Sequence, residues 1–174
     1  MKTKFFLLGA SAGILFLFTA GLIWLMMGGM PMGTAGGPLP FEKKLAHLAL
    51  DVSMRGQTSQ KSPISLDEAN LIRGAKVYKM NCAICHGLPS ENLSSIAAGM
   101  YPPPPKLMAP NKGVTDDEIG ETYWKVKNGI RLTGMPGFQK TLSDTEIWQV
   151  SGLLLTADKL PSSVQEELSN RIYK

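Results

Sequence analysis

The sequence has very few of the residues from which disulfide frameworks and zinc sites are built. Only two cysteines, Cys82 and Cys85, and two histidines, His47 and His86, occur in 174 residues. Two cysteines exclude a disulfide-rich secreted scaffold, which needs several pairs. A structural zinc site needs four ligands, and His47 lies far upstream of the other three candidates. The chemistry of these residues is therefore confined to one short motif.

The centre of the chain also lacks an excess of charge of either sign. The formal net charge is +4, but residues 65–158 carry nine Lys/Arg against ten Asp/Glu. The positive balance belongs to the flanking segments, and no basic stripe interleaved with aromatic residues crosses the centre. We therefore do not expect nucleic acid as a partner.

A long run near the N-terminus has no charged residue at all. Lys2 and Lys4 precede Phe5–Met27, and these 23 residues would span about 35 Å as a helix. This exceeds a hydrocarbon core of about 30 Å, so residues 1–27 are predicted to be a single-pass anchor in the cytoplasmic membrane. The two lysines favour a cytoplasmic N-terminus and a periplasmic, exported domain. The alternative is a cleaved signal peptide with its site at Gly33-Thr34-Ala35, which exports the same domain.

The chain after this run divides by composition. Residues 28–40 contain five glycines and three prolines, which is typical of a linker, and 13 flexible residues reach about 20 Å. Residues 41–64 are predicted to hold an extra helix, Phe41–Met54, and a connection. We expect residues 65–158 to form the main domain and residues 159–174 a C-terminal helical tail.

The exported part has helix signals and no convincing strand pattern. At four places Ser or Thr is followed three residues later by Glu or Gln, ahead of helix-spaced apolar residues. This capping signature predicts helices that begin at Ser65–Glu68, Thr115–Glu118, Ser143–Glu146 and Ser162–Gln165. The Pro-rich residues 99–110 and the Gly-rich residues 128–140 are typical of loops. The predicted fold class is all-α.

The motif Cys82-Ala83-Ile84-Cys85-His86 has a specific chemical meaning. Two thiols at this spacing can form thioether bonds to the two vinyl groups of a haem, and the following His can bind the iron. A thioredoxin-like redox dithiol would require a βαβ surround, which the sequence does not predict. We therefore expect one covalent haem c, attached through Cys82 and Cys85, with His86 as the proximal ligand.

A second iron ligand is predicted about fifty residues downstream, in Gly134-Met135-Pro136-Gly137. A Met thioether opposite His suits electron-transfer haem and raises its reduction potential. Pro136 favours an extended backbone at Met135, and the two glycines permit a tight loop. Met135 is therefore the predicted distal ligand; Met100 and Met108 are the alternatives.

Together these residues resemble class I cytochrome c, the bacterial single-haem type, over about Ser65–Ala157. Gly74, Tyr78 and Trp148 extend the likeness. The resemblance implies helices wrapped around one haem, with the first and last helices of the domain crossing closely at the glycine and aromatic residues packed around the contact.

The resemblance also implies further contacts with the haem. Pro105-Lys106-Leu107 is similar to the family's Pro-x-Leu, whose proline carbonyl accepts a hydrogen bond from the haem-binding His. Pro105 ends a run of four prolines, so the register of this match stays open. Arg131 and Trp124 are candidates to bind the haem propionates. A solvated surface position for Arg131 and core packing for Trp124 are the alternatives.

Filled axial positions leave no open site for a small-molecule substrate, so we expect an electron-transfer protein rather than an enzyme. The predicted protein is a membrane-tethered carrier between redox partners. The donor could be a quinol-oxidising complex, and the acceptor a terminal oxidase or a photosynthetic reaction centre. It could instead be a fixed haem subunit of a larger complex. A gas- or peroxide-binding haem protein with an open sixth position is the remaining alternative.

Overall fold

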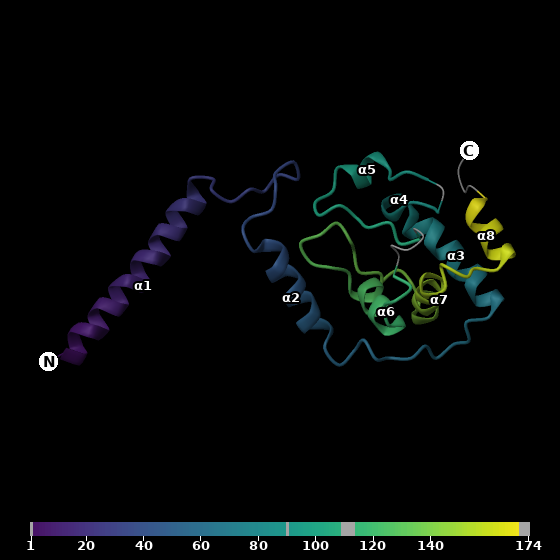
Figure 1. Ribbon diagram of the computed structural model, residues 1–174, viewed down its shortest axis with the longest axis horizontal. Helices are drawn as coiled ribbons and strands as arrows, with labels where there is room; N and C mark the ends of the chain where they lie inside the picture. The colour runs from purple at the N-terminus through teal and green to yellow at the C-terminus, as the bar shows by residue number, and fades with distance from the viewer. Residues whose placement is uncertain (1, 90, 109–113, 171–174) are drawn as a thin grey trace. The chain divides into compact units, whose positions relative to one another are not determined.

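The computed structural model describes residues 2–89, 91–108 and 114–170. These residues form eight helices and no strand, so the predicted all-α class is confirmed. The chain divides into two compact units, residues 1–40 and 41–174. The helices are α1 (Lys2–Met26), α2 (Glu42–Met54), α3 (Glu68–Asn81), α4 (Ala83–His86), α5 (Ser95–Ala98), α6 (Ile119–Asn128), α7 (Asp144–Leu155) and α8 (Ser162–Ser169) (Figure 1).

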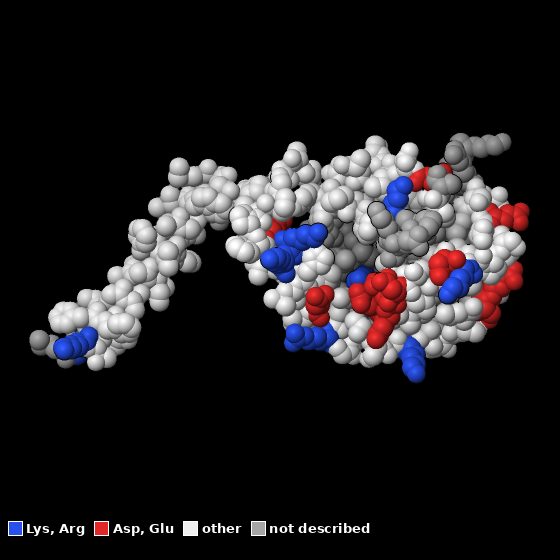
Figure 2. All heavy atoms as spheres, viewed as in Figure 1, with Lys and Arg blue, Asp and Glu red and all other residues white. Residues whose placement is uncertain are grey.

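The first unit contains the single helix α1, followed by turns over the Gly/Pro segment. None of the 25 residues of α1 is buried, and its charged residues are the two lysines at its start. Figure 2 shows the helix as an uncharged rod apart from these lysines. By length and composition α1 can cross a membrane, although a signal sequence meets the same two criteria.

The core of the second unit is the crossing of α3 and α7. Gly74 of α3 lies so close to α7 that a Cβ at this position would overlap the carbonyl of Gln149. This contact explains a glycine in mid-helix, where it costs about 1 kcal/mol relative to alanine. Tyr78 and Leu153, both fully buried, pack in the same cluster.

Two further helices complete this core. Tyr123 of α6 stacks on Trp148 of α7, with ring centroids 3.9 Å apart and planes 11° from parallel. The C-terminal helix α8 packs on α3 through the buried Val164 and Leu168. An ion pair between Lys79 and Glu167 holds the same two helices together. The tail is thus part of the folded core.

The capping signatures predict the presence of a helix more accurately than they predict the residue at which that helix begins. Only Ser143 forms the complete capping box, with reciprocal bonds to Glu146. In α3 the N-cap is Asp67, which accepts from the Asn70 amide at 2.9 Å, while Ser65 bonds to Asp67 instead. The predicted cap at Thr115 is wrong. Residues 114–117 form a turn, closed by a hydrogen bond from the Asp117 amide to the Val114 carbonyl, and α6 begins only after Glu118. Helix α8 starts after Pro161 with no side-chain cap.

Candidate functional site

The Cys-x-x-Cys-His motif forms the junction between α3 and α4. Cys82 is both the C-cap of α3 and the N-cap of α4. Its carbonyl oxygen accepts hydrogen bonds from the amides of Cys85, at 3.1 Å, and His86, at 2.9 Å. This single turn directs Cys82, Cys85 and His86 into one cavity. Neither cysteine forms a disulfide.

The opposite walls of this cavity come from segments distant in the sequence. The end of the proline run contributes Pro105, Leu107 follows it, and the loop after α6 contributes Met135. Apolar side chains fill most of the remaining wall, including Val126, Ile130, Phe138 and Leu154. An apolar wall excludes water, which lowers the local dielectric around any charged group bound there.

His86 is held by the predicted partner. Its Nδ1 lies 2.7 Å from the carbonyl oxygen of Pro105. Because a carbonyl oxygen can only accept, Nδ1 carries the hydrogen, and the lone pair of Nε2 is available for a metal. Burial lowers the pKa of His86, and the bond to Pro105 opposes this shift. The imidazole is therefore neutral at neutral pH, as a ligand must be.

The thiol of Cys82 is shielded from water. Burial, with a smaller contribution from neighbouring Cys85, raises the pKa of Cys82 to about 12. Its thiol is therefore protonated and unreactive toward disulfide exchange, which proceeds through the thiolate. This environment does not suit a redox dithiol.

The loop that carries Met135 folds back tightly on the end of α6. Gly129 ends the helix at φ +69°, a left-handed conformation that favours glycine, and a Cβ there would meet the backbone of Pro136 and Gly137. The amide of Ile130 donates to the Met135 carbonyl at 3.1 Å, and the Thr133 hydroxyl accepts from the Met135 amide, also at 3.1 Å. These bonds fix the Met135 backbone at the cavity.

Residues 69–153, just under half of the chain, match the model of the family described as cytochrome c oxidase, cbb3-type, subunit III. The chain contains a c-type cytochrome domain. Such a domain carries covalent haem c and transfers electrons. The residues that line the cavity fit a covalent haem, because the cavity combines two thiols, a neutral imidazole and a thioether within apolar walls.

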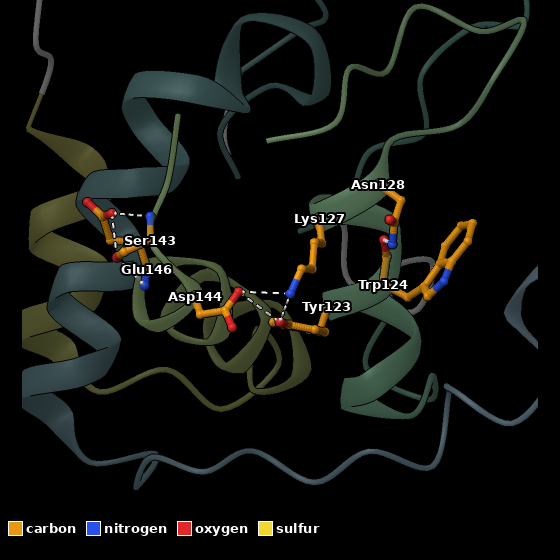
Figure 3. Close-up of polar contacts among 7 residues, drawn as sticks. All are labelled: Tyr123, Trp124, Lys127, Asn128, Ser143, Asp144 and Glu146. Atoms are coloured by element: carbon orange, nitrogen blue, oxygen red, sulfur yellow. Dashed lines mark hydrogen bonds and ion pairs between the residues drawn. The ribbon is translucent and has the colours of Figure 1, made fainter. Parts of the chain in front are cut away.

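The other predicted site residues of the cytochrome domain lie apart from the cavity. Arg131 is exposed, and neither Arg131 nor Trp124 lines the cavity wall. Figure 3 shows the Trp124 ring pointing away from Tyr123, on the opposite side of α6. Binding of the propionates by these two residues stays a prediction.

The two alternative methionine ligands differ in their position relative to the cavity. Met108 is buried in the hydrophobic core and does not line the cavity. Met100 does line it, together with Met135. His47 lies on α2, is exposed and does not line the cavity. Met100 is therefore the thioether against which the role of Met135 has to be tested.

The structure also shows a polar cluster that the sequence analysis missed. The Tyr123 hydroxyl donates to Asp144 at 3.0 Å and accepts from Lys127 at 2.8 Å, and Lys127 also pairs with Asp144 at 3.0 Å (Figure 3). Hydrogen bonds from Lys127 and Tyr123 lower the pKa of Asp144. The cluster ties α6 to the start of α7. Its only sequence signal is the i, i+4 spacing of Tyr123 and Lys127.

Proposed function

We propose that this protein is a membrane-tethered mono-haem cytochrome that carries single electrons between redox partners on the exported side of the membrane. The observation that supports it most is one cavity lined by both cysteines, His86 and Met135. With His86 and Met135 both bound to the haem iron, no coordination position would stay open for a substrate. This arrangement suits electron exchange with little rearrangement.

Each residue has a distinct role in this proposal. Cys82 and Cys85 would hold the haem covalently, and His86 would bind its iron through Nε2, with the ring orientation fixed by Pro105. Met135 would provide the second, soft ligand, and Leu107 would help to exclude water. When bound, the haem supplies an iron that gains or loses one electron. The chain itself neither binds nor releases a proton at these ligands, since His86 is held neutral.

The tether and the partner are proposed from the chain outside the cytochrome domain. Helix α1 would anchor the protein in the cytoplasmic membrane, and residues 28–40 would let the domain turn within about 20 Å. The partners are redox complexes such as a quinol-oxidising complex, a terminal oxidase or a reaction centre. The family description favours a fixed place in an oxidase complex over a mobile carrier.

Replacement of Met135 tests the filled sixth position. We expect wild-type ferric protein to be low-spin with a sulfur-to-iron charge-transfer band, and Met135→Ala to lose this band and bind carbon monoxide rapidly when reduced. Met100→Ala is the matched control, because Met100 lines the same cavity, and it should keep the band. Loss of the band in Met100→Ala alone would make Met100 the ligand. A high-spin wild-type protein without the band would instead favour gas or peroxide binding.

A further inference from the structure

Helix α2 has apolar side chains on two opposite sides, and only one side is covered. Met54 is buried and Leu50 half-buried, so this side faces the cytochrome unit. On the other side lie Phe41, Leu45, Leu48 and Val52, which we call the exposed stripe. Their exposed fractions are 71%, 62%, 56% and 46%. The spacing of three and four residues places them along one helix face.

Apart from α1, no other described helix exposes several large apolar side chains along one face. The hydrophobic core cluster contains no residue of α2. Three large apolar side chains along a 13-residue helix, with Phe41 at its N-cap, are more than the scattered exposure that is normal on a surface. A stripe of this kind usually marks contact with a protein or a membrane.

The order of the chain decides between these occupants. The 15 residues between α1 and α2, which include the Gly/Pro linker of residues 28–40, reach about 20 Å, so an anchored α1 keeps α2 close to the membrane surface. A short flexible linker gives millimolar effective concentrations, at which a weak interfacial helix is mostly bound. Residues 42–55 carry three basic residues, Lys43, Lys44 and Arg55, against Glu42 and Asp51, and this net positive charge suits anionic headgroups.

We propose that α2 lies in the membrane interface, with the exposed stripe among the upper acyl chains and its lysines among the headgroups. An interfacial helix of this kind is buried about 5–10 Å into the boundary between headgroups and acyl chains. The proposal goes beyond the proposed function but rests on its membrane anchoring by α1.

Docking of α2 would also orient the haem cavity. The Tyr101 hydroxyl hydrogen-bonds the side chain of Glu42 at the start of α2. Tyr101 stands between Met100 and Pro102, both of which line the cavity. Met54, at the other end of α2, is buried. A docked α2 therefore restricts how the cavity can face along the membrane.

Site-directed spin labelling of the full-length holoprotein tests this proposal. A nitroxide is attached to Leu48→Cys or to Ala46→Cys after haem attachment, and the protein is reconstituted in vesicles of phosphatidylcholine and phosphatidylglycerol. Ala46 is the matched control, because it is exposed on the side of α2 opposite Leu48. Power saturation of the reduced protein measures how often the nitroxide collides with oxygen, which concentrates in lipid, and with a water-soluble nickel complex.

We expect the label at position 48 to collide several-fold more with oxygen than with nickel, and the label at position 46 to show the reverse. Equal, water-like values at both positions in reconstituted protein would overturn the interfacial helix while leaving the anchor intact. Protection of position 48 from both reagents would assign the stripe to a protein contact and overturn the lipid contact. Protein that stays outside the vesicles would refute the anchor itself.

A second measurement uses the whole domain. In oriented bilayers, the haem absorption of the wild type should show measurable linear dichroism. The variant Leu45→Ser/Leu48→Ser/Val52→Ser should lose it, because without the contact of α2 with the membrane the domain turns freely on its linker. These positions are exposed, so the variant should keep its visible spectrum. Unchanged dichroism in a correctly folded variant would contradict the proposal.

Discussion

The side chain of Tyr78 links α3 to the chain just beyond the haem motif. Its hydroxyl is fully buried and donates to the Gly87 carbonyl at 2.7 Å, one residue after His86. Burial, with a smaller contribution from Cys82, raises the pKa of Tyr78 well above its ordinary value, so the hydroxyl is a permanent donor. This bond holds the end of the motif against the core.

Tyr78→Phe should therefore lower the free energy of unfolding by about 1–3 kcal/mol, because the buried Gly87 carbonyl loses its partner. Urea unfolding of the holoprotein followed by circular dichroism measures this loss. Tyr123→Phe is the control, since the side chains of its hydroxyl partners, Lys127 and Asp144, are 33% and 67% exposed and water can reach them; we expect a loss below about 1 kcal/mol. Equal losses would contradict a special role for Tyr78.

Residues whose role follows from local covalent chemistry are the ones that the sequence predicts best. The motif at Cys82–His86 and the bond from His86 to Pro105 needed only short patterns and a family resemblance. The polar cluster of Tyr123, Lys127 and Asp144 needed the packing of α6 on α7, which no local pattern contains. For the same reason the sequence did not show which apolar residues would line the cavity.

At the scale of the element, the start of α7 offers a direct test of capping. The Ser143 hydroxyl accepts from the Glu146 amide at 3.3 Å, and the Glu146 carboxylate accepts from the Ser143 amide at 2.8 Å. Ser143→Ala should cost about 0.5–2 kcal/mol of stability. Ser162→Ala in α8 is the control with no cap bond to lose, and it should be near neutral. Equal effects in urea unfolding would refute the cap.

The same cap predicts a change with pH. Hydrogen bonds from the hydroxyl and amide of Ser143 lower the pKa of Glu146 in the folded protein. Its stabilisation is therefore present above the unfolded pKa and is lost as the pH falls through the folded pKa. Ser143→Ala should raise the Glu146 pKa toward its ordinary value, measured by carboxyl NMR titration, and reduce this acid loss. An unchanged pKa would show that the hydroxyl contributes nothing.

Helix boundaries were harder to predict than helices. The signatures at Ser65 and Thr115 have the right composition, but Asp67 and a turn at Val114–Asp117 satisfy the backbone there instead. Several local partners compete for the same amide groups, and only the folded chain decides among them. The short helices α4 and α5 were not predicted, because four residues are too few to show a helical period.

The whole molecule combines a cytochrome unit with its own core and a helix that contributes nothing to that core. The core cluster runs from Leu71 to Leu168, and no residue of α1 is buried. The described structure therefore predicts that residues 41–174 fold and bind haem without α1. Membrane attachment and redox chemistry should be separable properties of this chain.

Replacing residues 1–27 with a cleavable signal peptide tests this separation. We expect a soluble periplasmic protein with the visible spectrum of the full chain, whereas the wild type should stay in membranes through an alkaline carbonate wash. An unrelated apolar span of the same length should restore membrane retention, because α1 acts by length and hydrophobicity. Wild-type protein that is soluble and begins after Ala35 would instead identify residues 1–35 as a cleaved signal. Without its anchor, α2 loses its high effective concentration at the membrane, so its contact should become weak and reversible.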